Sequence, residues 1–174
     1  MKLNNIIIMA AVAFGASSMA YAKEQGHGKV TFEGAIIDAP CSITPEASDQ
    51  TVELGQISNV TLKNGGKSTP RNFTIDLENC EISQEADAKN KVSVSFSGTT
   101  GAVKNMLGTG LGASIAITDG AGKIIELTKP TSAQELQNGN NSLKFTAYLQ
   151  GDGASATVTE GKFSTTANFT LAYE

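Results

Sequence analysis

The sequence predicts an all-β protein built as a β-sandwich, and three observations carry that prediction. Segments of alternating apolar and polar residues recur at even spacing along the chain. Residues that favour turns, mainly glycine, asparagine, aspartate and proline, lie between these segments. No segment of useful length has apolar residues at the spacing of an amphipathic helix. A chain of 174 residues, 40% of them hydrophobic, is long enough to bury one core, so we expect a single domain behind a short leader.

The first 22 residues have the features of a signal peptide. Met1-Lys2 gives a positive start, an apolar run extends from Ile6 to Phe14, and Ala20-Tyr21-Ala22 offers small residues at both positions that a signal peptidase reads. The apolar run is too short to span a membrane, and no later stretch reaches the required length. We therefore expect residues 1–22 to be removed on export, with Lys23 at the start of a mature chain that has no membrane span.

The first expected strand runs through residues 28–37, and its apolar residues occupy one face only. The apolar positions are Val30, Phe32 and Ile36, and the polar positions are Lys29, Thr31 and Glu33. Gly34 falls on the apolar face and leaves a gap there, and Ile37 beside Ile36 makes the end of the strand apolar on both faces. A strand that served only its own core would have little use for the gap. Our hypothesis is that this strand fills the core of another molecule.

Further strands follow in order, separated by turns. Pro40 and Pro45 lack an amide donor and interrupt the chain around the first cysteine. The alternating segments that we expect to form strands are residues 50–54, 72–79, 91–96, 113–118, 123–127, 143–149 and 161–174. Glycines mark the end of the first of these segments at Gly55 and a hairpin turn at Asp119-Gly120-Ala121-Gly122.

Cys41 and Cys80 are the two cysteines of the chain. An even number in an exported protein favours one disulfide, with a metal-binding pair as the alternative. The metal alternative is poor, because the one histidine, His27, lies far from both in the sequence. Cys80 falls off the apolar face of the 72–79 strand if that strand stays regular. We therefore expect a twist, a bulge or the strand end at Glu78-Asn79.

The segment that ends the sequence alternates for its whole length and is the longest strand that we expect. Its apolar face carries Phe163, Thr165, Ala167, Phe169, Leu171 and Tyr173. The sequence stops at Glu174, directly after this strand, so nothing further is left to pair with its far edge unless the N-terminal strand folds back. A long apolar edge is an aggregation hazard that secreted proteins cover.

Composition and motifs disfavour several other functions. A net charge of −4 without clustered lysine or arginine argues against nucleic acid as a partner. Asn64-Gly65-Gly66-Lys67-Ser68 has the tail of a phosphate loop, but Thr61 stands where its first glycine is required. The glycines from Gly108 to Gly112 lack dinucleotide-binding spacing, and a lone histidine provides neither a catalytic pair nor an imidazole zinc site. We expect no enzyme, no cofactor and no metal.

Four segments of the chain together resemble the pilin subunits of chaperone–usher pili, above all the major rod subunits of the P and type 1 kinds. They are residues 28–34, residues 38–43, residues 49–57, and an ending in which a glycine is followed by alternating apolar positions and a penultimate tyrosine, here Gly161 to Tyr173. The resemblance covers nearly the whole mature chain.

The resemblance implies an incomplete immunoglobulin-like β-sandwich in residues 38–174 that lacks its seventh strand, preceded by a donor-strand extension in residues 23–37. It implies that the disulfide joins Cys41 to Cys80. The residues implied on the donated face are Val30, Phe32, Gly34 and Ile36. The residues implied in the acceptor groove or in contact with a chaperone are Gly161, Phe163, Ala167, Phe169, Leu171 and Tyr173.

The function that the resemblance implies is that of a structural subunit of a fimbrium on the bacterial surface, which supports adhesion. Copies of the subunit would polymerise by donor-strand exchange, after a periplasmic chaperone has lent a strand to the groove and with an outer-membrane usher as a further partner. A minor adaptor or terminator subunit is one alternative. A self-complemented secreted binding domain is another, disfavoured because the chain from Ile37 to Cys41 leaves the strand little reach.

Overall fold

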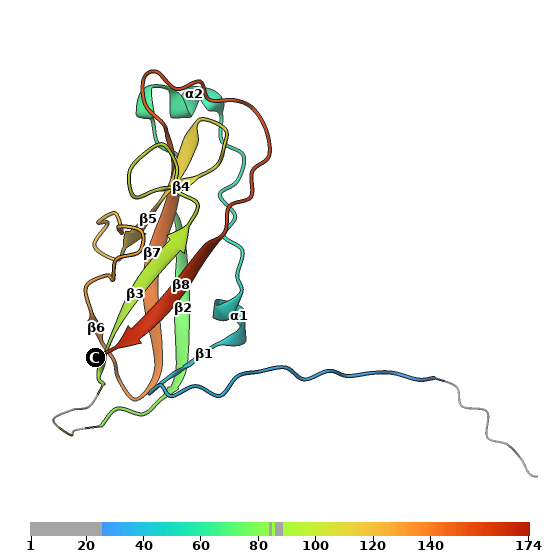
Figure 1. The fold of residues 1–174 in the computed structure, drawn as a ribbon, viewed down its shortest axis with the longest axis vertical. Helices are drawn as coiled ribbons and strands as arrows, with labels where there is room; N and C mark the ends of the chain where they lie inside the picture. The colour runs from blue at the N-terminus through green and yellow to red at the C-terminus, as the bar shows by residue number, and fades with distance from the viewer. Residues whose placement is uncertain (1–25, 84, 86–88) are drawn as a thin grey trace, which may run out of the picture. The chain divides into compact units, whose positions relative to one another are not determined.

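The computed structural model describes residues 26–83, 85 and 89–174, so the expected signal peptide and Lys23 lie outside the described residues. The chain divides into two compact units between Ile36 and Ile37. The regular structure of the second unit is mainly strand, with three short helical turns: α1 (Pro45–Ser48), α2 (Asn59–Leu62) and the 3-10 turn η1 (Lys63–Gly65) (Figure 1). No helix in the described part of the chain is long and apolar enough to cross a membrane.

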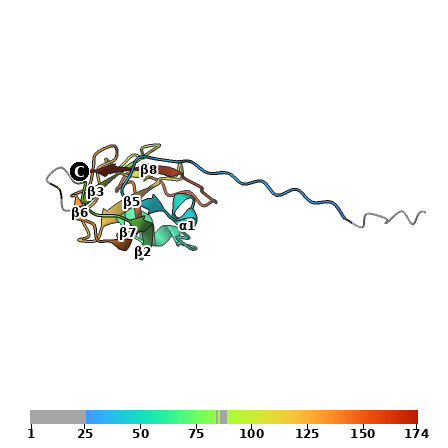
Figure 2. The ribbon, with the colours of Figure 1, turned by 90° about the horizontal axis from the view of Figure 1, so that it is seen from below.

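The strands form two antiparallel sheets. They are β1 (Ser42–Ile43), β2 (Arg71–Cys80), β3 (Lys91–Gly98), β4 (Leu107–Gly108), β5 (Ala113–Asp119), β6 (Gln134–Glu135), β7 (Gly139–Gly151) and β8 (Ala167–Tyr173). One sheet has the order β1-β2-β7-β5-β4 and the other the order β6-β3-β8. Viewed from below, the layer that contains β3 and β8 lies against the layer that contains β2 and β7 (Figure 2). This arrangement confirms the predicted β-sandwich.

The core lies between the two sheets and is built from alternate residues of their strands. Each strand presents one face inward because successive side chains point to opposite sides of a sheet. Phe145 of β7 and Phe96 of β3 meet across the core with ring centroids 5.2 Å apart, nearly perpendicular to each other. The largest apolar side chains that are less than 2% exposed are Ile75, Leu77, Val92, Val94 and Phe145.

The disulfide and the irregularity beside it are confirmed. Cys41 and Cys80 are joined, and both are buried. The pairing of β2 with β7 changes register between Leu77 and Cys80, and Asn79 has a positive φ of 53°. This bulge turns Cys80 inward, which an unbroken alternation could not do.

Two predicted strands are absent in part or altogether. Residues 50–54 are extended but belong to no ladder, and in the last segment only Ala167–Tyr173 is a strand, while residues 161–166 are unpaired. The alternation of inward and outward side chains is present in both segments; what each lacks is a neighbouring backbone with which to form hydrogen bonds. The prediction that the last strand is the longest is therefore wrong, because β7 has 13 residues and β8 has 7.

The prediction of a strand at residues 123–127 is also wrong, although the turn before it is confirmed. Asp119 accepts hydrogen bonds from the amides of Ala121 and Lys123, which fixes the turn. Beyond a single bridge between Thr118 and Ile124, the chain leaves β5 and crosses to the other sheet, where the Thr128 amide donates to the Phe96 carbonyl at 2.7 Å. A segment that changes sheets cannot complete a hairpin.

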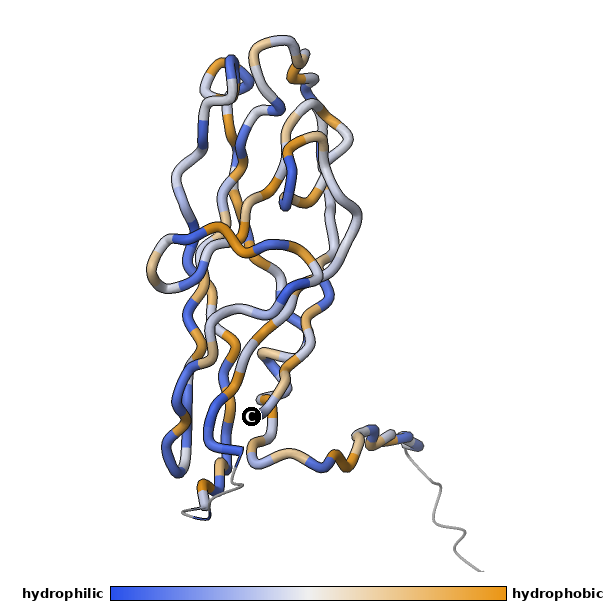
Figure 3. The backbone as a smooth tube through the Cα atoms, turned by 60° about the vertical axis from the view of Figure 1, so that its left-hand side comes forward, coloured by the Kyte–Doolittle hydropathy of each residue, from blue (hydrophilic) through white to orange (hydrophobic). Residues whose placement is uncertain are grey.

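The described part of the first unit, residues 26–36, forms no β-ladder, so the expected strand at 28–37 has no partner in this structure. Its apolar side chains are exposed: Val30 by 74%, Phe32 by 90% and Ile36 by 104%. Hydrophobic and hydrophilic residues alternate along this segment (Figure 3). The segment thus has the sequence of an amphipathic strand and the exposure of an unpaired one.

Candidate functional site: an open groove in the sandwich

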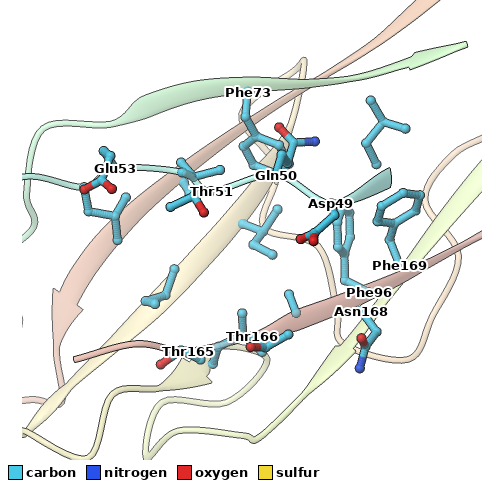
Figure 4. Close-up of a pocket in the computed structure, with 18 of the residues that line it drawn as sticks. Asp49, Gln50, Thr51, Glu53, Phe73, Phe96, Thr165, Thr166, Asn168 and Phe169 are labelled. Atoms are coloured by element: carbon cyan, nitrogen blue, oxygen red, sulfur yellow. The ribbon is translucent and has the colours of Figure 1, made fainter. Parts of the chain in front are cut away.

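A groove of about 780 Å³ runs along the second unit between two extended segments, residues 49–55 and residues 163–169. Figure 4 shows the two segments as opposite walls, with Asp49, Gln50, Thr51 and Glu53 on one side and Thr165, Thr166, Asn168 and Phe169 on the other. The groove is lined by more than twenty side chains that come from both sheets. It is therefore an opening into the sandwich itself.

The floor of the groove is formed by side chains of the hydrophobic core. Its side chains come from five strands and are Phe73, Ile75, Phe96, Leu107, Ile115, Ile117 and Ala147. Phe73 lies edge-on to Phe96, with ring centroids 6.4 Å apart, and tilted against Phe145 at 5.5 Å. Phe73 is only half-buried, although it belongs to this aromatic cluster. The sandwich thus leaves apolar surface without a cover along one side.

The first wall, residues 49–55, is held against β2 by side chains. Thr44 caps α1 and Pro45 begins it, and the chain leaves this single turn in an extended conformation at Asp49. The Gln50 side chain then donates to the Thr74 carbonyl of β2 at 2.9 Å. Apolar side chains of the wall, Val52 and Leu54, pack against the core. The backbone amides and carbonyls of residues 50–55 form no hydrogen bond with any described residue.

The second wall, residues 163–169, continues into β8. One edge of β8 pairs with β3, where Ala167 lies opposite Gly98 and Phe169 opposite Phe96. Its other edge has no neighbour among the described strands, since β8 ends the order of its sheet. The Thr165 hydroxyl donates to the Gly108 carbonyl at 2.9 Å and fixes the segment before β8. The groove is therefore bordered on both sides by backbone with unused hydrogen-bonding groups.

This geometry suits one kind of occupant. An extended chain could form hydrogen bonds with the free backbone of both walls, while every second side chain entered the apolar floor. Unpaired strand edges beside an open apolar core are also the features that make a β-protein prone to associate. The groove can thus accept an amphipathic β-strand, and its chemistry is one of binding.

The structure brings some of the sequence-predicted groove residues together and places others elsewhere. Phe163, Ala167 and Phe169 line the groove, as does Thr165. Leu171 and Tyr173 pack against the core beyond the lining, and Gly161 is exposed, where an added Cβ would lie 3.3 Å from Leu111.

Tyr173 is a special case among these residues. Its hydroxyl is buried and makes no hydrogen bond with any described residue. Burial raises the pKa of the Tyr173 phenol, because the charged form is poorly solvated there. A buried polar atom without a partner is rare in folded proteins, so this hydroxyl is a candidate for a hydrogen bond to another molecule.

The first wall and the floor were missed as site residues. Val52 and Leu54 carried a signal, since their alternation predicted a strand, but that pattern does not reveal that the strand lacks a partner. Phe73 and Phe96 gave no signal of their own, because an apolar residue that lines an open core has the same sequence pattern as one in a closed core.

Known proteins match this chain over almost its whole length. The family described as fimbrial protein matches residues 30–174. Fimbria A protein of Serratia marcescens is 57% identical over 178 residues, and the major MR/P fimbria protein of Proteus mirabilis (strain HI4320) is 44% identical over 180 residues; both alignments cover 100% of each chain. A chain in the solved structure of a chaperone–usher pilus that reveals the molecular basis of rod uncoiling is 35% identical, with a TM-score of 0.76 over 86% of this chain and 97% of that chain.

Proposed function

The chain belongs to the fimbrial protein family, and from that premise we propose that its N-terminal strand fills the open groove of a neighbouring copy and so links copies into a rod. The chain is a structural subunit of a chaperone–usher pilus, and it is exported through the periplasm to the bacterial surface. The fold is the incomplete immunoglobulin-like sandwich of such pilins. Donor-strand exchange explains how an incomplete sandwich becomes a stable building block.

The observation that carries the proposal is the match between one unpaired strand and one open groove. The donor face from Val30 to Ile36 and the two walls, residues 49–55 and 163–169, each span seven residues, or about 20 Å at the rise of a β-strand. One segment has an apolar face without a core, and the other two enclose a core without a cover. The same chain thus carries both halves of a joint.

The side chains of the donor suit the floor. Val30, Phe32 and Ile36 are exposed, and burying each would contribute about 1.5–3 kcal/mol. A Cβ atom added to Gly34 would meet no described atom of its own chain within 4 Å. Its missing side chain fits a place where the floor of the neighbour is shallow, and a larger residue there would be overpacked.

Two further partners follow from the same groove. A subunit that waits for its neighbour exposes an apolar floor and two free backbone edges, which invite aggregation. A periplasmic chaperone that lends a strand of its own would cover them, and the buried Tyr173 hydroxyl lies where such a partner could offer a hydrogen bond. An outer-membrane usher would then bring the next subunit to the joint.

A deletion inside the donor tests the proposal. Removing residues 30–36 keeps the expected cleavage site after Ala22, the groove and the disulfide, so the exported domain should fold, yet it cannot donate. We expect no fibres by electron microscopy when this variant is the only subunit, and shortened fibres when it is co-expressed with the natural chain, because it still accepts a donor. A matched deletion of residues 24–27 keeps the donor face and should leave fibres long. Long fibres from the 30–36 deletion alone would overturn the proposal.

A further inference from the structure

The two ends of the groove differ in chemistry. At one end both walls lead to α2: residues 49–55 run into it, and Asn59 at its start donates to the Glu160 carboxylate, three residues before Phe163, at 3.5 Å. Val60 of α2 is 66% exposed. Among the described residues outside 30–37, no other large hydrophobic side chain is as exposed as Val60. This end of the groove therefore carries an exposed apolar side chain, and the carboxylate beside it, Glu160, already has a hydrogen-bond partner in Asn59.

The other end of the groove is acidic. Asp49 lies there, close to Phe169, with its carboxylate directed into the groove (Figure 4). Glu53 lies further along the same wall (Figure 4), on the part of the chain that leads to α2. Neither carboxylate forms a hydrogen bond or an ion pair with any residue that the structure describes. An unpaired carboxylate on the wall of a groove is available to a basic group on whatever enters it.

The donor segment has the same polarity as the groove. Lys29 precedes the first apolar residue, Val30, and points to the polar face, while Ile37 follows the last, Ile36, and is 59% exposed. Glu33 shares the polar face with Lys29, four residues further on, which is also the spacing of Asp49 and Glu53. The donor therefore begins with a basic residue and ends with an apolar one.

We propose that the groove recognises both ends of the strand of a second copy: Asp49 pairs with Lys29, and Val60 on α2 receives Ile37. The inference rests on the proposed donor-strand joint and deepens it by naming the residues that set direction and register. In this direction the incoming strand runs antiparallel to β8, the pairing with the better hydrogen-bond geometry. In the opposite direction Ile37 would lie against the acidic end and Lys29 against Val60.

The position of Ile37 in its own domain is consistent with this assignment. Ile37 leads within four residues to Cys41, whose disulfide partner Cys80 lies opposite Gly139 at the start of β7. α2 lies at the other end of β7, where an added Cβ on Gly151 would collide with the Leu62 carbonyl. The domain thus has its chain entry at one end and α2 at the other. If the donated strand of a second copy leaves the groove at α2, the domains of the two copies are joined end to end.

Charge reversal at Asp49 gives different results for the two directions. In the proposed direction Lys29 lies at Asp49 and Glu33 at Glu53, so Asp49→Lys should speed the release of subunits from fibres about threefold, and Glu53→Lys should slow it by a similar factor. In the reverse direction Ile37 lies at Asp49 and Glu33 still lies at Glu53, so Asp49→Lys would leave the release rate unchanged and only Glu53→Lys would slow it. The measurement is the rate at which fibres of the full exported chain release subunits at a fixed guanidinium concentration and low salt. Equal signs, or no change in either variant, would overturn the inference.

A rescue experiment links Asp49 to its partner. Adding Lys29→Asp to Asp49→Lys restores opposite charges across the joint, so the release rate should return to that of the natural chain. The effect of Asp49→Lys should also shrink as salt is raised, because exposed charges are screened. A double variant that is slower to assemble and less stable than either single variant would show that the two residues do not meet.

Matched substitutions test the apolar end. Val60→Ser and Ile37→Ser should each speed subunit release about fivefold, and the two together should do no more than one alone, because both remove the same contact. Thr61→Ser on the same helix is the control and should change nothing. Independent, multiplying effects of Val60→Ser and Ile37→Ser would overturn the contact. If the natural chain and the 24–27 deletion themselves formed no fibres, the donor-strand proposal would fail; failure of the residue pairs in intact fibres would remove only this inference.

Discussion

Two segments of this protein, residues 30–36 and residues 167–173, have nearly the same pattern and opposite fates. Both alternate apolar and polar residues over seven positions. The first exposes its apolar face almost completely, whereas the second half-buries its own against the core and pairs with β3 along one edge. The difference does not lie in strand propensity. It lies in whether the chain supplies a neighbour.

The neighbour that β8 receives is specific. The Phe169 ring lies 6.4 Å from that of Phe96, which is itself packed on Phe145, so β8 joins an aromatic cluster inside the sandwich. Donation would give the first segment, residues 30–36, a comparable set of neighbours in the groove of another copy. If the two segments are equivalent strands in different molecules, substitutions in residues 167–173 should affect the isolated subunit and substitutions in residues 30–36 should affect the fibre.

The largest expected effect distinguishes Phe169 of β8 from Phe32 of the donor segment. Phe169→Ala should lower the free energy of unfolding of the isolated subunit by about 1–2 kcal/mol, because it removes a half-buried ring that packs against the aromatic cluster. Phe32→Ala should leave that free energy unchanged, since Phe32 is 90% exposed, but should accelerate the release of subunits from fibres about a hundredfold. Urea unfolding of the subunit and fibre dissociation measure the two quantities. The equivalence breaks if Phe32→Ala destabilises the isolated subunit or leaves fibres as long-lived as before.

A smaller effect is expected at the gap in the donor face. Gly34→Leu should destabilise the joint by about 1–3 kcal/mol through overpacking, while the isolated subunit is unaffected because nothing lies within 4 Å of the added Cβ. Ala35→Leu is the control, since the same bulk on the polar face should be tolerated. Fibre yield and dissociation in guanidinium report the difference. If both leucines had the same effect, Gly34 would not face the floor of a groove.

The smallest expected effect concerns Tyr173 at the end of β8. Burial raises the pKa of its phenol in the folded state above the unfolded value of about 10. The contribution of the Tyr173 phenol to the free energy of unfolding is therefore fully present below about pH 10 and is lost as pH rises through the folded pKa. Tyr173→Phe should remove this alkaline loss and, because the hydroxyl has no partner, should not destabilise the subunit at pH 7. Thermal unfolding between pH 7 and pH 11 is the measurement, and an unchanged alkaline loss in the variant would contradict the assignment.

Alternation in the sequence was sufficient to predict the paired strands and insufficient wherever the partner was missing. The strands at β2, β3, β5 and β7 were predicted because their alternating residues bury one face against the core of the same chain. Residues 50–54 and 161–166 have the same alternation and failed as strands because no backbone lies beside them. These two failures lie on the walls of the groove, so the errors of the prediction fall at the candidate site.

The remaining error has a different cause. At residues 123–127 the turn residues were recognised, but the change of sheet after Ile125 is fixed by long-range hydrogen bonds, from Thr128 to Phe96 and from Thr131 to Val94. Such contacts leave no local pattern. The floor of the groove was unpredictable for a related reason, since Phe73 and Phe96 become site residues only through the absence of a cover.

The disulfide has a mechanical consequence in a polymer joined through residues 30–36. A pull on the donated strand of one subunit arrives at its Cys41 and passes through a covalent bond to Cys80, at the end of the ten-residue strand β2. β1, which has two residues and follows directly, is bypassed. The load therefore enters the sheet along β2, whose hydrogen bonds to β7 would have to shear together, and it does not peel the sheet open from its weakest edge.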